Sequence, residues 1–138
     1  MPNLSRFVEA QDGIYADALD ELRAGQKRTH WMWFVFPQLV GLGRSDTARF
    51  YGISGLDEAR AYVAHDVLGP RLEECCDAVL DWWGRKSSDD MFGPIDSVKL
   101  RSSMTLFERA ARKPEKFGAV LEGFYAGTRD LETLRRLA

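Results

Sequence analysis

The sequence predicts an all-α, compact, multihelical single domain of about five to seven helices. Apolar residues recur at helical spacing in several segments, and most glycines and prolines fall between those segments. No segment shows the sustained alternation of apolar and polar residues that is typical of strands. The length of 138 residues fits one domain over 1–138, and a hydrophobic content of 45% is enough to build one core.

In the first third of the chain, the earliest predicted helix is Ile14–Ala24, which Gly25 closes as a C-terminal cap. The next apolar stretch, Trp31–Phe36, is apolar on every face, so periodicity alone does not separate a helix from a strand. A lone strand would leave its backbone unpaired, and Pro37 cannot continue a helical hydrogen-bond pattern. We therefore expect a short helix that ends by about Val35.

The later segments carry the strongest helical periodicity. A helix over 70–83 begins with Pro70, which suits a first helical position, and a helix over 97–112 takes Asp96 as its N-cap. A third begins at Pro114 and has the i, i+3, i+4, i+7, i+8 apolar stripe before Gly127. Shorter helices are expected at 46–51, Leu56–Ala64 and 129–137.

The net charge and the cysteines indicate which partners and which cellular compartment to expect. Nineteen Lys and Arg against 21 Asp and Glu give a net charge of −2, which provides no general attraction to nucleic acid or anionic membranes. The last 42 residues carry 9 basic and 5 acidic groups, a pattern more typical of a solvated helical face than of a binding stripe. Adjacent Cys75 and Cys76 cannot easily bridge to each other, and no signal-peptide pattern is present. We expect a cytoplasmic protein with no nucleic-acid or membrane partner and no cofactor; no particular protein partner is indicated.

The irregular segment that follows the tryptophan-rich stretch is the candidate site. Gly41 and Gly43 would let backbone N–H groups converge, Arg44 would supply a guanidinium for a phosphate or carboxylate, and Ser45 begins a short helix. The same residues also suit a structural role, in which Ser45 caps the helix and the glycines make the turn. Neither the dinucleotide fingerprint nor the Lys-Ser/Thr ending of a phosphate-binding loop is present.

Aromatic residues beside this segment suggest a ligand that bears a ring. An indole near a guanidinium can hold a planar ring with an acidic group, although core packing explains the tryptophans equally well. The predicted ligand is a small anion such as a nucleotide or acidic metabolite, and no catalytic residue is identified. The predicted ligand-binding residues are His30, Trp31, Trp33, Gln38, Gly41, Gly43, Arg44, Ser45, Lys99, Arg101 and Ser103.

Two alternative functions remain open. His30, the His65-Asp66 pair and a later aspartate follow the order of ligands in metal-dependent HD phosphohydrolases, whose histidines and carboxylates converge on a divalent metal. That order arises easily in a chain that contains 12 aspartates. The other alternative is a protein–protein interaction module whose aromatic surface forms a partner groove.

Six sequence blocks carry a family resemblance: Arg28–Leu39, Gly41–Ser45, Tyr51–Ile53, His65, Leu68–Leu72 and Lys99–Phe107. These blocks resemble a bacterial family known as domain of unknown function 1810, which is sometimes labelled calpastatin. The resemblance implies a mainly α-helical single domain and supplies no activity, cofactor or catalytic residue. Calpastatin inhibits its protease as a disordered chain, which an aromatic-rich globular sequence does not resemble. The residue after the histidine is often proline in this family but is Asp66 here, which weakens the HD interpretation.

Overall fold

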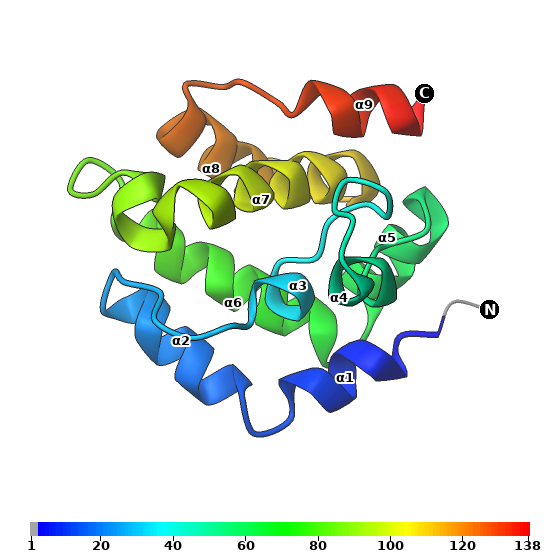
Figure 1. Cartoon of the computed structure of the whole chain (residues 1–138). Coiled ribbons are helices and arrows are strands. Elements are labelled where there is room, and N and C mark those ends of the chain that lie inside the picture. The colour runs from blue at the N-terminus through cyan, green and yellow to red at the C-terminus, as the bar shows by residue number, and fades with distance from the viewer. Residues whose placement is uncertain (1–2) are drawn as a thin grey trace.

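Nine helices are present in residues 3–138, the part of the chain that the computed structural model describes (Figure 1). This number exceeds the predicted five to seven, and the all-α class is confirmed. The only backbone pairing of the β type in these residues is an isolated bridge between Leu39 and Ile53. The helices are α1 (Ser5–Gln11), α2 (Tyr15–Arg23), α3 (Met32–Val35), α4 (Asp46–Phe50), α5 (Leu56–Ala64), α6 (Leu68–Leu80), α7 (Ser88–Ala110), α8 (Glu115–Tyr125) and α9 (Leu131–Leu137).

Helix α1 was not predicted because a polar residue occupies its core-facing side. Phe7 and Gln11, four residues apart, are both buried. The Gln11 side-chain amide donates to the Phe34 carbonyl at 2.8 Å and to the Tyr62 hydroxyl at 3.1 Å. Because these bonds satisfy the buried amide, the glutamine can take a core position that hydropathy would assign to the surface.

Helix α7 begins nine residues before the predicted 97–112 helix, and the prediction of Asp96 as its N-cap is wrong. Ser87 caps α7 through a capping box with Asp90. The helix then continues through a kink, where Gly93 has φ 82° and ψ 161° and Pro94 follows. A Gly-Pro pair predicts a break, yet here the glycine makes the turn that joins two helical segments. Asp96 lies beyond the kink, and its carboxylate pairs with Lys27 at 2.9 Å.

The core lies between the two central helices and the layers that cover them. In Figure 1, α6 and α7 cross the middle of the molecule, α1 and α2 lie below them, and α8 and α9 lie above. Helix α7 packs against α5, α8 and α9, and α6 packs against α2, α5 and α8. The largest fully buried side chains include Trp31, Tyr62, Phe107 and Phe117. Among the described residues, no helix combines the length and apolar character needed to cross a membrane.

The loop between α3 and α5 is closed by the Leu39–Ile53 bridge. The Val40 amide donates to the Ile53 carbonyl at 2.8 Å, and the Ile53 amide donates to the Gln38 carbonyl at 2.9 Å. Gly52 is required here because a Cβ atom would lie 2.7 Å from the Val40 backbone. The closed loop brings Ala48 of α4 and Tyr51, its C-cap, to the same hollow as Met32 and Trp33 of α3.

Candidate functional site

Trp31 belongs to the core and is positioned by a hydrogen-bond network around Glu21. The fully buried indole donates from Nε1 to Glu21 Oε1 at 3.0 Å, and the Arg28 and Thr29 amides donate to the same oxygen. Partial burial acts to raise the pKa of Glu21, but these bonds and the Thr29 hydroxyl outweigh it and lower the pKa to about 2. Glu21 therefore holds both the loop before α3 and the ring of Trp31.

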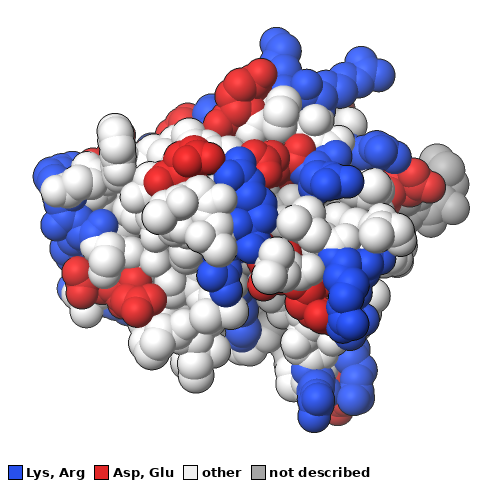
Figure 2. All heavy atoms as spheres, turned by 90° about the horizontal axis from the view of Figure 1, so that it is seen from above, with Lys and Arg blue, Asp and Glu red and all other residues white. Residues whose placement is uncertain are grey.

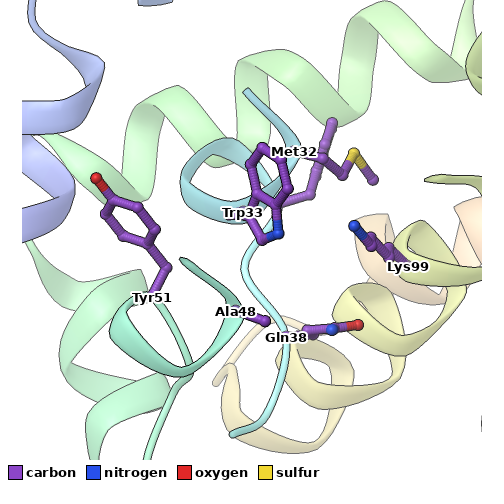
Figure 3. A pocket seen from close by; sticks show the side chains of 7 residues that line it. Met32, Trp33, Gln38, Ala48, Tyr51 and Lys99 are labelled. Atoms are coloured by element: carbon purple, nitrogen blue, oxygen red, sulfur yellow. The ribbon is translucent and has the colours of Figure 1, made fainter. Parts of the chain in front are cut away.

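Three of the predicted ligand-binding residues meet at one small hollow between α3, α4 and α7 (Figure 3). Trp33, Gln38 and Lys99 line it, and the Lys99 ammonium lies 4.8 Å from the centre of the Trp33 ring. Lys99 also lies 3.7 Å from the Asp96 carboxylate. The hollow has a volume of about 10 Å³. That is room for roughly one water molecule, so the hollow as it stands does not admit a ring.

The Gly41–Ser45 segment forms the turn and the cap of α4. Ser45 Oγ accepts from the Ala48 amide at 3.1 Å, which confirms the structural role considered for this serine. Gly41 has φ 95°, and Arg136 from α9 lies against the position that a Cβ atom would occupy. Arg44 is exposed and lines neither this hollow nor the larger cavities described below.

The remaining predicted residues lie apart from the hollow. His30 is exposed on the loop before α3, and Ser103 is fully buried, with no hydrogen-bond partner for its hydroxyl within 3–138. Arg101 lines a different cavity, beside Tyr125. The structure thus divides the predicted set among the core, the surface and two cavities. Because Trp31 is buried and Trp33 only half exposed, these rings do not form the aromatic surface of the predicted interaction module.

The histidines give no support to the metal-dependent alternative. His65 Nδ1 accepts from the Val67 and Leu68 amides at 3.1 and 3.3 Å, where the chain enters α6. Asp66 is exposed. Across residues 3–138, no group of three or more His, Cys, Asp or Glu side chains is placed to hold a metal ion.

A much larger cavity, which sequence reasoning missed, lies between α5, α6 and the end of α7. Its volume is about 920 Å³. Its floor is apolar and includes the buried Phe117. We call it the basic groove because four cations and a single carboxylate line it. The lining residues are Arg60, Val63, Ala64, Glu73, Arg109, Ala110, Ala111, Arg112, Lys113 and Phe117.

Most cations of the basic groove have no carboxylate partner. Arg60 pairs with the exposed Asp57 at 3.3 Å, and Glu73 lies 3.6 Å from Lys116. In the described part of the chain, Arg109, Arg112 and Lys113 form no ion pair within 4 Å. On the face shown in Figure 2, Lys and Arg lie in several groups with Asp and Glu beside most of them. The feature of the sequence that points to this groove is the excess of basic residues in the last 42 positions, a pattern also typical of a solvated helical face.

Comparisons with known proteins agree with the resemblance found in the sequence. The family described as "Protein of unknown function (DUF1810)" matches residues 1–137. The fold is similar to the crystal structure of the conserved hypothetical protein Rv1873 from Mycobacterium tuberculosis, with a TM-score of 0.96 and 53% sequence identity. That similarity covers 99% of this chain and 96% of the other. No curated protein matches the chain significantly.

Proposed function

We propose that this chain, which belongs to the DUF1810 family of proteins of unknown function, binds a small organic anion in the basic groove. The observation that carries the proposal is one cavity of about 920 Å³ with an apolar floor and three cations that form no ion pair within residues 3–138. Cavities of roughly 300–1,000 Å³ with apolar walls and a few polar groups are typical of small-molecule sites.

The charge of the groove selects the ligand. Arg109, Arg112 and Lys113 stand close together in sequence at the end of α7 and around the loop that follows it. The negative end of the helix dipole and its free carbonyls stabilise a cation at this position, but within the described residues no carboxylate lies within 4 Å of these three cations. A phosphate or carboxylate of a ligand would supply this partner and can bind a guanidinium through two parallel hydrogen bonds. The ligand should therefore carry more than one negative charge.

The floor of the groove selects an apolar part in the same ligand. Val63, Ala64 and Ala111 are exposed or half-buried and contribute apolar side chains to this lining, above the buried Ala110 and Phe117. A planar or aliphatic group placed on this floor would remove apolar surface from water. A nucleotide or a ring-bearing acidic metabolite combines such a group with negative charge. The sequence predicts the same ligand class, and the volume of the basic groove supports the proposal that it binds there.

For the site predicted at Trp31–Ser45, we propose only a smaller contact with part of an anion. The hollow beside Trp33 and Lys99 would admit one oxygen atom of an anion, because it has room for roughly a single water. Arg44 would have to turn toward that hollow to contribute. A variant of Arg44 therefore separates the two locations.

Isothermal titration with AMP and with citrate tests the proposal. The double variant Arg109→Gln/Arg112→Gln should weaken binding by about 10-fold or more, since two charge-assisted contacts are removed. Raising NaCl from about 50 to 200 mM should also weaken binding by the unaltered protein, because exposed charges are screened.

The control is Arg28→Gln/Arg44→Gln, which removes the same charge from two exposed arginines outside the groove. It should change affinity less than about 2-fold. Equal affinity of the groove variant and the unaltered protein would overturn the proposal. Failure of both AMP and citrate to bind would also overturn it. If only the control variant lost binding, the result would indicate that the anion binds at the Trp31–Ser45 segment.

A further inference from the structure

A second cavity lies at the kink of α7 and differs from the basic groove in its chemistry. Its volume is about 340 Å³, and it opens between the first turns of α7, the segment after the kink and the end of α8. Because Gly93 turns the chain, the first segment folds back until Ser88 Oγ and Ser97 Oγ are 2.7 Å apart. The cavity is lined by Ser87, Ser88, Asp89, Ser97, Val98, Arg101, Phe124 and Tyr125.

Arg101 also lines this cavity. Its Nε is buried and has no hydrogen-bond partner in the described part of the chain, and its guanidinium carbon lies 6.0 Å from the centre of the Tyr125 ring. No carboxylate of residues 3–138 lies within 4 Å of its nitrogens. A buried guanidinium N–H without an acceptor is costly. Arg101 as a whole is half-buried and lines the cavity, so its guanidinium is the cation that a carboxylate in this cavity would meet.

Asp89 lines the same cavity and also lacks an ion-pair partner within the described residues. It does not pair with Arg101, although both charges lie near the Tyr125 hydroxyl. Burial, the largest influence, raises the pKa of this hydroxyl, while Arg101 lowers it and Asp89 raises it. The cavity therefore presents one cation and one anion that are kept apart.

The walls between these charges combine hydroxyl groups with apolar surface. Tyr125 donates its hydroxyl to the Ser97 carbonyl at 2.6 Å, which fixes the ring at the inner wall. Val98 is 52% exposed and Phe124 is half-buried, and both line the cavity. The charges and the apolar walls together would fit a molecule with a carboxylate, an ammonium and an apolar side chain.

We propose that this cavity binds a free α-amino acid with an apolar or aromatic side chain. The carboxylate accepts from Arg101, the ammonium donates to Asp89, and the side chain lies against Val98 and Phe124. A dianion is disfavoured because Asp89 repels it, and a cation is disfavoured because Arg101 repels it. This site is separate from the basic groove, so it stands or falls without the proposed function.

Titration with L-phenylalanine, followed by calorimetry and by amide chemical shifts of the isotope-labelled protein, tests the proposal. Binding should be accompanied by shifts at Ser97, Arg101 and Tyr125. N-acetyl-L-phenylalanine lacks the ammonium and L-phenylalaninamide lacks the carboxylate, so each should bind at least about 10-fold more weakly.

Matched variants assign each charge to its partner. Asp89→Asn should reduce the affinity for L-phenylalanine while leaving the affinity for the N-acetyl compound unchanged or higher. Arg101→Gln should weaken both, whereas Arg28→Gln, at an exposed arginine that lines none of the three cavities, should affect neither. Failure of L-phenylalanine to bind, equal binding of all three compounds, or shifts confined to other elements would overturn the proposal.

Discussion

Replacing Glu21 with glutamine should destabilise the protein in a way that depends on pH. The Glu21 carboxylate accepts hydrogen bonds from the Arg28 amide at 2.6 Å, the Thr29 amide at 2.9 Å and the Trp31 indole at 3.0 Å. A glutamine keeps one acceptor oxygen but loses the charge that strengthens these bonds. The loop before α3 should lose part of its attachment to α2.

The size of the effect follows from the shift in pKa. Partial burial raises the pKa of Glu21, but hydrogen bonds from Thr29, Arg28 and Trp31 outweigh it and lower the pKa from 4.5 to about 2. Without solvent screening, a shift of that size corresponds to ~3.4 kcal/mol. Water reaches this side chain, so we expect roughly half, about 1.5–2 kcal/mol. Because the pKa is lowered on folding, this stabilisation is complete above about pH 5 and is lost as the pH falls from 4.5 toward 2.

Urea unfolding of the unaltered protein and of Glu21→Gln, measured at about pH 7 and pH 3, checks this reasoning. The difference in free energy of unfolding should be about 1.5–2 kcal/mol at neutral pH and less than about half of that at pH 3. Asp20→Asn removes a neighbouring exposed charge from α2 and should have little effect at either pH. A difference that is absent at pH 7, or that stays constant down to pH 3, would refute the role given to the carboxylate.

Three further predictions concern stability and reactivity. Gly93→Ala should lower the free energy of unfolding by about 1–3 kcal/mol, because φ is 82° at this position. Gly55→Ala, at an open position with φ 169°, should change the free energy of unfolding by less than about 0.5 kcal/mol. Equal effects of the two variants in thermal unfolding would contradict this reasoning. Arg6→Ala should lower the free energy of unfolding by roughly 3 kcal/mol, because it leaves the buried Glu58 without its 3.1 Å ion pair. A double-mutant cycle of Arg6 and Glu58 should give a coupling energy above about 1 kcal/mol. Additive losses of stability would count against a stabilising ion pair. Burial raises the pKa of the Cys75 thiol to about 12, so it should react with a disulfide reagent at about pH 8 only after unfolding; rapid reaction in the folded state would show that the thiol is accessible.

Much of the fold could be predicted because its helices follow local rules. Leu56–Ala64 was predicted with the bounds of α5, and the helix expected from Pro114 differs from α8 only at its ends. The missed start of α7 carried a local signal, the Ser87–Asp90 capping box, whereas α1 was missed because a tertiary contact replaced the local signal. Gln11 occupies a core position because Phe34 and Tyr62 satisfy its amide, and that pairing is not visible in the sequence.

The candidate site was harder to predict, because its residues come from elements far apart in the chain. Periodicity indicates which face of a helix is buried but not which distant helix covers it. Trp33 and Lys99, 66 positions apart, do meet, yet Arg44 lies elsewhere. The basic groove joins Arg60 of α5 to Arg112 in the loop after α7, and only the basic excess of the C-terminal third pointed to that region.

The most direct test of the central claim is an amide chemical-shift titration of the isotope-labelled protein with AMP. If the basic groove is the anion site, the largest shifts should map to residues 109–113 and to the α5 residues across the groove, and they should disappear in Arg109→Gln/Arg112→Gln. Saturating AMP that leaves these amides unmoved, or that shifts Gly41–Ser45 instead, would contradict the account.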